Sequence, residues 1–375
     1  MPAVWFVWGS GADGQLGIGD TLDYSMPTEM VVGQPEVGSL AATPPPVVVI
    51  TGGCHSAAID ASGTLYTWGS NAHGQLGHSA SSITTPSPMA ILPVKARTTT
   101  VACGWAHSVV ATTDSTEGTT AVFSCGSNQY DQLGHTHDSA TPLRVFPATV
   151  AVVSLACGWK HSLLATSTGH VYAWGLGRHG ELGLGPDQPR ATTPTQLPGV
   201  DGVVAVHCGW QHSVLHLASR EILVTGNNRH GQLGLGNDAP KSVMQPQPLP
   251  ASTPFDAIAV GWHHVIGLVD GQVYSWGRGA FGQLGYYSDA FVATPQHLDL
   301  PPIAAVACGS EHSLFLTQAG ELLTCGWGEH GNLGHGDGAN VTTPTPVAFF
   351  HRRRLVVDRC CAAGAVSMAR AAVAE

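Results

Sequence analysis

The sequence predicts an all-β fold, a seven-bladed β-propeller that takes in the whole chain as one domain, residues 1–375. Three observations predict it: a ten-residue motif occurs seven times, a second motif recurs in phase with it, and the two ends of the chain carry complementary parts of one repeat. A repeat of about fifty residues that reads as several short strands is typical of a propeller. The repeat therefore overrides the larger number of domains that length alone would favour.

The first motif, called here the Gly-Gln-Leu-Gly motif, is typified by Trp68–Gly77. Its glycines indicate tight turns with backbone angles that glycine tolerates best. The motif has neither the lysine nor the strand-to-helix setting of a phosphate-binding loop. Successive copies begin 49 to 60 residues apart. The copies are Trp8–Gly17, Trp68–Gly77, Cys125–Gly134, Trp174–Gly183, Thr225–Gly234, Trp276–Gly285 and Cys325–Gly334.

The second motif, the Cys-Gly-Trp-x-His-Ser motif, lies upstream of the first in each repeat. Between the two motifs an alternating apolar stretch is broken by a turn, as in Ala57–Gly63 followed by Thr64–Trp68. This arrangement predicts short strands joined by tight turns. The copies are Gly52–Ser56, Cys103–Ser108, Cys157–Ser162, Cys208–Ser213, Gly261–Val265 and Cys308–Ser313.

The ends of the chain complete each other. The chain begins with Val4–Gly9, which matches a late strand of the repeat, and finishes with Val356–Cys361 and Ala365–Ala369, which match the early strands. We therefore expect the N-terminal strand to pair with the C-terminal blade and close a ring of seven. Closure removes the free sheet edges that invite aggregation.

Composition and charge narrow the function classes. The formal net charge is -10, and the one run of basic residues is His351–Arg354. Binding to DNA or RNA through phosphates needs a basic surface, so no direct nucleic acid partner is expected. A solvated strand edge and an anionic-partner contact both stay open for His351–Arg354. No secretory or membrane-spanning stretch is evident, which predicts a cytoplasmic protein with nuclear access left open and no membrane association.

Cysteine and histidine recur four residues apart, which could indicate metal or thiol chemistry. A catalytic pair is needed once, whereas matching pairs around a ring indicate a shared structural task. We expect the imidazoles to hydrogen-bond hydroxyl groups where blades meet. The nine cysteines are expected to be reduced, and no catalytic residue, metal or cofactor is predicted. The pairs are Cys103 and His107, Cys157 and His161, Cys208 and His212, and Cys308 and His312.

Tryptophan forms a further series at equivalent positions, namely Trp105, Trp159, Trp210 and Trp262. A ring of exposed indoles on one rim would make a stacking platform or a protein-binding face. Packing between neighbouring blades is the alternative interpretation. Both are open at the level of the sequence.

The paired motifs resemble the repeats of the regulator of chromosome condensation family, from about residue 4 to residue 370. Members of that family are seven-bladed β-propellers. Within it, Cys308–His312 and Cys325–Asn332 resemble segments of two compact members: the animal secretion-regulating guanine nucleotide exchange factor and the fungal killer-toxin-insensitivity propeller. The fungal protein pairs with a small zinc-ribbon protein that acts in diphthamide synthesis and in Elongator-dependent wobble-uridine modification of tRNA.

Several positions depart from the family pattern. Thr225 replaces a strand tryptophan, Asp131 replaces a turn glycine, and Cys361 and Gly364 stand where glycine and histidine are expected. Candidate insertions lie at Tyr24–Val49, Thr112–Thr120 and Asn237–Phe255, and the proline content of the first and last indicates irregular loops. No nucleotide-exchange residue can be transferred from the family's chromatin-bound member.

The plant UV-B photoreceptor of this family has arginine after its motif tryptophans, where it holds a dimer together. Here the residues that follow the tryptophans are Ala106, Lys160, Gln211 and His263. The resemblance therefore does not imply photoreception.

The leading functional hypothesis is a non-enzymatic propeller that binds a small zinc-ribbon partner and regulates diphthamide synthesis and tRNA wobble-uridine modification, as a monomer or heterodimer. A guanine nucleotide exchange factor for a small GTPase is the first alternative, and a structural subunit of a larger complex is the second. The predicted partner-binding residues are Trp327, Glu329, His330, Glu311, Trp159, Trp210 and Trp262.

Overall fold

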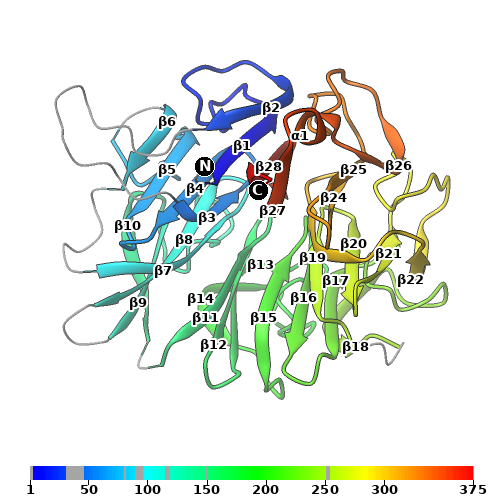
Figure 1. Ribbon diagram of the computed structural model, residues 1–375. Helices are drawn as coiled ribbons and strands as arrows, with labels where there is room; N and C mark the ends of the chain where they lie inside the picture. Colours follow the sequence, from blue (N-terminus) through cyan, green and yellow to red (C-terminus); the bar gives the residue numbers. More distant parts are fainter. Residues whose placement is uncertain are drawn as a thin grey trace.

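The computed structural model describes residues 3–30, 46–79, 82–89, 96–114, 119–148, 150–250 and 254–374. These residues form seven four-stranded antiparallel sheets, arranged as blades around a central axis (Figure 1). In each blade the chain runs outward from the innermost strand, and innermost strands of adjacent blades contact each other. The predicted seven-bladed propeller is confirmed.

Six blades are continuous in the chain, and their strands run in order from innermost to outermost. Blade 1 has β3 (Pro46–Thr51), β4 (His55–Asp60), β5 (Leu65–Ser70) and β6 (Ser82–Pro88); blade 2 has β7 (Ala96–Cys103), β8 (His107–Asp114), β9 (Thr120–Gly126) and β10 (Ser139–Ala148); blade 3 has β11 (Val152–Cys157), β12 (His161–Thr166), β13 (Val171–Leu176) and β14 (Arg190–Gln196). Blade 4 has β15 (Val203–Cys208), β16 (His212–Leu217), β17 (Ile222–Asn227) and β18 (Ser242–Pro248); blade 5 has β19 (Ala257–Val260), β20 (His264–Val269), β21 (Gln272–Gly277) and β22 (Val292–Leu298); blade 6 has β23 (Ile303–Cys308), β24 (His312–Thr317), β25 (Leu322–Gly326) and β26 (Val341–Pro346).

Blade 7 joins the two ends of the chain. Its strand order is β27 (Leu355–Ala363), β28 (Val366–Val373), β1 (Val4–Gly9) and β2 (Tyr24–Met30). The register between β1 and β28 runs without interruption over the six residues of β1. Predicted closure is confirmed, with the addition that two N-terminal strands take part. The short helix α1 (Ala348–Arg352) precedes β27, and no helix in the described ranges has the length and apolar character needed to span a bilayer.

Two of the candidate insertions contain outermost strands of blades, which were not predicted from the sequence. Tyr24–Met30 and Ser242–Pro248 are β2 and β18, so the prediction of irregular loops is wrong for these parts. Their prolines misled the prediction, although an outermost strand has a free edge that tolerates proline. In the second candidate, residues 112–114 and 120 belong to β8 and β9. Residues 31–45, 115–118 and 251–253 lie outside the described residues.

The hydrophobic core lies between neighbouring blades. The Gly-Gln-Leu-Gly motif packs against the next blade and forms hydrogen bonds with it. The leucine of every copy is buried, and the glycines at the second, seventh and last positions of the motif have positive φ, as predicted for these turns. The Trp68 indole donates from Nε1 to the Gln15 carbonyl of the preceding blade over 2.9 Å. Trp8 makes the same bond to Asn332, over 3.0 Å. Where Thr225 replaces tryptophan, its hydroxyl donates to the Gly180 carbonyl instead, over 2.7 Å.

Candidate partner-binding face

Both motifs lie on the same face of the ring, called here the motif face. The Cys-Gly-Trp-x-His-Ser motif forms the turn between the first and second strands, and the Gly-Gln-Leu-Gly motif forms the loop between the third and fourth. In blade 6, for example, His312 pairs with Gly326, which pairs with Val341. Because the strands alternate in direction, these two connections must emerge at one end of every blade.

The histidines of the second motif connect neighbouring blades. Each of five imidazoles has its Nε2 within 2.8–3.0 Å of a serine hydroxyl in the next blade, and all are fully buried. Each serine in turn donates to a main-chain carbonyl of the preceding blade's Gly-Gln-Leu-Gly loop. The predicted imidazole–hydroxyl bonds are confirmed. The pairs are His55–Ser108, His107–Ser162, His161–Ser213, His264–Ser313 and His312–Ser367.

The histidine–serine hydrogen bond is missing at two of the seven boundaries between blades. His212 faces Val265, which has no hydroxyl, and its Nε2 has no hydrogen-bond partner. In blade 7 the position of the histidine is taken by Val366, because Val366 pairs with Gly9 as His312 pairs with Gly326. The alignment that placed Gly364 at the histidine position was wrong by two residues, since such shifts are hard to recognise in a segment of alanine and cysteine.

The glycine before each motif tryptophan is required by close contact with the imidazole. A Cβ atom added to Gly158 would lie 2.3 Å from Cε1 of His161. Real Cβ contacts do not come so close, so any other residue would displace the imidazole from its serine partner. The motif glycine and histidine therefore form one packing unit.

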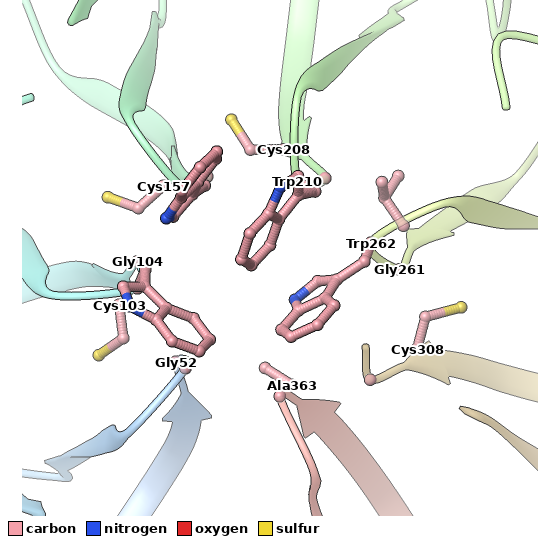
Figure 2. Close-up of a pocket in the computed structure, with 18 residues that line it drawn as sticks. Gly52, Cys103, Gly104, Cys157, Cys208, Trp210, Gly261, Trp262, Cys308 and Ala363 are labelled. Carbon is pink, nitrogen blue, oxygen red and sulfur yellow. The ribbon is translucent and has the colours of Figure 1, made fainter. Parts of the chain in front are cut away.

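The cysteines of the second motif line the central pocket but direct their sulfur atoms away from it, as Figure 2 shows for Cys103, Cys157, Cys208 and Cys308. Burial raises the pKa of the Cys157 thiol to about 12. All nine cysteines are free thiols. Across the described ranges, no three His, Cys, Asp or Glu side chains are grouped so that they could hold a metal ion.

The four motif tryptophans gather over the mouth of the central channel. The Trp159 and Trp210 rings are stacked with centroids 4.4 Å apart, Trp262 lies 4.4 Å from Trp210, and Trp105 lies 5.4 Å from Trp210. Figure 2 shows Trp210 and Trp262 converging toward the pocket centre. The indoles thus pack on one another at the centre of the ring. An exposed ring of indoles and packing between blades were the two interpretations from the sequence, and neither included this contact among the indoles. Trp105 is 40% exposed, so the cluster presents apolar surface to solvent.

The loop around Trp327 lies on the same face, at the boundary of blades 6 and 7. Trp327 is half-buried, Glu329 is exposed, and the His330 ring meets the Trp327 ring edge-on at 5.1 Å. Nδ1 of His330 lies 2.7 Å from a carboxylate oxygen of Asp23, which comes just before β2. The loop is therefore anchored to the N-terminal segment while its aromatic and carboxylate groups stay accessible.

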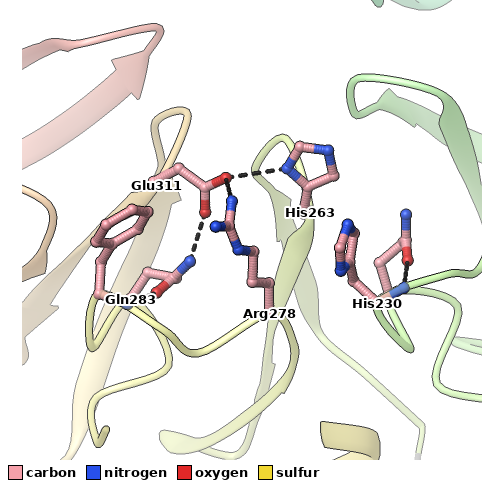
Figure 3. A network of polar contacts seen from close by, with 7 residues as sticks. His230, His263, Arg278, Gln283 and Glu311 are labelled. Carbon is pink, nitrogen blue, oxygen red and sulfur yellow. Dashed lines mark hydrogen bonds and ion pairs between the residues drawn. The ribbon is translucent and has the colours of Figure 1, made fainter. Parts of the chain in front are cut away.

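Glu311 is placed differently from the other predicted contact residues. Its side chain is buried, and the carboxylate accepts hydrogen bonds from His263, Arg278 and Gln283 (Figure 3). Burial alone would raise the pKa of Glu311, but the bond to His263 and the charge of Arg278 hold it below the usual value. Its main-chain carbonyl accepts from the Trp327 amide over 2.8 Å. Glu311 therefore positions neighbouring loops.

Glu181 occupies the position that is glutamine or asparagine in the other six Gly-Gln-Leu-Gly motifs. Its carboxylate accepts from the His179 amide over 2.7 Å, and burial raises the pKa of Glu181 to about 7. The folded protein therefore binds more protons than the unfolded chain between pH 4.5 and about 7. Glu181 consequently removes stability as the pH rises through that range.

Replacing this carboxylate by the amide of its relatives is expected to stabilise the fold. Glu181→Gln should raise the free energy of unfolding by about 3 kcal/mol above pH 7, and by much less near pH 4.5. Urea unfolding at several pH values measures this difference. The reciprocal variant Gln232→Glu, at an equally buried position, should lose stability with the opposite pH dependence. If the free energy of unfolding depended on pH in the same way in all three proteins, the assignment of a raised pKa to Glu181 would be contradicted.

Comparison with known proteins agrees with this geometry. The RCC1-like domain family matches residues 4–369. The protein belongs to the RCC1-like domain family. The predicted resemblance to the regulator of chromosome condensation repeats is thereby confirmed.

The chain is similar to curated members of that family over most of its length. It is 32% identical to the secretion-regulating guanine nucleotide exchange factor of Mus musculus, over 92% of this chain and 78% of the relative. It is also 32% identical to the ultraviolet-B receptor UVR8 of Arabidopsis thaliana, over 90% of this chain and 76% of the receptor. Human WBSCR16 has the same fold, with a TM-score of 0.85 and 24% identity over the full length of both chains.

Proposed function

We propose that this protein is a non-catalytic, cytoplasmic interaction propeller that binds a small zinc-ribbon protein and thereby regulates diphthamide synthesis and Elongator-dependent wobble-uridine modification of tRNA. The observation that carries the proposal is the Trp327 loop on the motif face. It combines a half-exposed indole, an exposed carboxylate and an anchored imidazole. The other residues predicted to contact the partner, Trp159, Trp210 and Trp262, lie in the tryptophan cluster on the same face.

The physical chemistry of this loop suits a protein contact. A partly exposed tryptophan offers a large apolar area with few rotatable bonds, and such residues dominate interface energies. The hydrogen bond between His330 and Asp23 reduces the freedom of the loop before binding. The carboxylate of Glu329 can accept a hydrogen bond from the partner at the rim of the apolar contact.

Titration of the purified propeller with the zinc-loaded zinc-ribbon protein of the diphthamide pathway tests the proposal. We expect Trp327→Ala combined with Glu329→Ala to weaken binding by at least about tenfold, since a central aromatic contact contributes more than 1 kcal/mol. The matched control is Tyr287→Ala combined with Asp289→Ala, which removes an exposed aromatic and a carboxylate from blade 5. Binding that survives the first double variant, or no binding by the unmodified propeller, would count against the proposal.

Guanine nucleotide exchange on a small GTPase is the second candidate. The 32% identity to the secretion-regulating guanine nucleotide exchange factor, over 92% of this chain, favours it. In this case the propeller would displace nucleotide by disturbing the phosphate and magnesium site of the GTPase. Release of labelled GDP from a panel of small GTPases distinguishes the two functions, because only an exchange factor would accelerate release on the order of a thousandfold.

A further inference from the structure

Four cationic side chains form an arc on the motif face over blades 3, 4 and 5. Lys160 lies in the turn between β11 and β12, while Arg178, Arg229 and Arg278 lie in the loops after the third strands of three successive blades. The chain has only 15 lysine and arginine residues and a net charge of -10. Four of these 15 side chains lie on one sector of the motif face, so this sector is more basic than the protein as a whole.

The outer part of this cationic arc is available to a ligand. Arg178 and Arg229 are exposed, and neither guanidinium forms an ion pair within the described part of the chain. His179, next to Arg178, has its Nδ1 3.4 Å from the Ser242 hydroxyl of blade 4, and Ser242 pairs with Asn227, two residues before Arg229. Burial lowers the pKa of His179, and the charges of Arg229 and Arg178 lower it further. Two unpaired guanidinium groups from adjacent blades thus flank one position on the surface.

The inner part of the arc borders the tryptophan cluster. The Lys160 ammonium lies 3.4 Å from the ring centroid of Trp159 and 4.0 Å from that of Tyr130. Arg278 contacts Glu311, whose carboxylate is shared with His263 (Figure 3). A cation and aromatic rings are therefore in contact at this end of the arc, and the arc also acts on the buried carboxylates of Glu181 and Glu311. The exposed carboxylates of the same three loops, Asp187, Asp238 and Asp289, come later in each loop than the arginines.

The next sector of the same face has the opposite charge. Glu329 in blade 6 and Asp13 and Asp23 in blade 7 are exposed. A propeller has nearly equivalent loops around its axis, so shape alone would let a partner dock in several rotations. Unlike charges on adjacent sectors favour one rotation and penalise the others.

We propose that the cationic arc binds an acidic peptide segment of the protein partner and so sets the orientation of that partner on the motif face. A carboxylate-rich segment matches the paired, exposed guanidinium groups. An extended polyphosphate fits less well, because nucleic-acid binding relies on more phosphate contacts than the four cations of the arc offer. The inference holds for any protein partner of this face and does not depend on the zinc-ribbon proposal.

Fluorescence anisotropy with a labelled deca-glutamate peptide tests the inference. We expect saturable binding at low ionic strength that weakens when the salt concentration is raised several-fold. Arg178→Gln combined with Arg229→Gln should reduce the affinity about tenfold, because two charge-assisted contacts are lost. Since both side chains are exposed, thermal unfolding of this variant should match that of the unmodified protein.

A matched control separates the cationic arc from a general charge effect. Arg352→Gln combined with Arg353→Gln removes the same charge from the last residue and the C-cap of α1, which precedes β27 and lies on the opposite face, and should leave the affinity within twofold. Absence of peptide binding, or equal losses for both double variants, would overturn the inference. Tighter binding of an oligothymidine of the same length would also overturn it and would identify the arc as a nucleic-acid site. None of these outcomes depends on Trp327, so they are distinguishable from failure of the zinc-ribbon proposal.

Discussion

Mild acid is expected to unfold this protein. Six buried histidines of the Cys-Gly-Trp-x-His-Ser motif have pKa values that burial lowers from 6.5 to about 3 or 4. The unfolded chain therefore binds more protons than the folded protein below pH 6.5, so stability is complete above that pH and is lost as the pH falls toward 4. One pH unit below 6.5, each histidine favours unfolding by about 1.4 kcal/mol, and six together by about 8 kcal/mol. This approaches the whole stability of a typical domain, about 5–15 kcal/mol.

Urea unfolding between neutral pH and pH 5, followed by circular dichroism, measures this loss. The dependence of the unfolding free energy on pH should correspond to the uptake of several protons. Replacing a single buried imidazole, as in His161→Gln, should reduce that uptake by about one proton. His73→Gln, at an exposed position, should leave it unchanged. A stability that stays level from pH 7 to pH 5 would show that the imidazoles can be protonated in the folded state.

The sequence predicted those elements that a local repeat encodes. The blade number and the closure follow from complete copies such as Trp68–Gly77 and from the incomplete repeat at Val4–Gly9. The outermost strands were harder to predict, because residues such as Tyr24–Met30 are half-exposed, contain proline and lack a clear apolar alternation. A proline at the same place in every repeat is the signal that could have identified them. It occurs at Pro27, Pro86, Pro142, Pro194, Pro246, Pro295 and Pro344.

The functional face was predicted in part. The imidazole–hydroxyl bonds could be predicted because histidine and serine are adjacent in one motif. Glu311 looked like a contact residue, yet its carboxylate is buried, since its three donors come from His263, Arg278 and Gln283 in blade 5. The cationic arc was missed for the same reason. Its members lie far apart in the sequence, and only the circular arrangement of blades places the loop of Arg178 beside the blade that carries Arg229.

Removal of residues 1–30 is expected to abolish cooperative folding. It would delete β1 and β2, expose the edge of β28, and remove Trp8, which is fully buried and contacts the Phe350 ring after β26. Loss of such a tryptophan alone costs about 3–5 kcal/mol. The truncated chain should therefore aggregate or lose its thermal transition, whereas Trp8→Ala should retain a transition at a lower temperature. Circular dichroism and size-exclusion chromatography measure both outcomes.

Hydrogen exchange of the unmodified protein tests ring closure most directly. If β1 and β28 share one blade, the amides of Val4–Gly9 and Val366–Val373 exchange only when the whole protein unfolds. Their free energy of opening should then equal that of β12 and β13 in blade 3, as measured by mass spectrometry of proteolytic peptides. Much faster exchange in both terminal strands, with blade 3 still protected, would show an open ring and contradict the account.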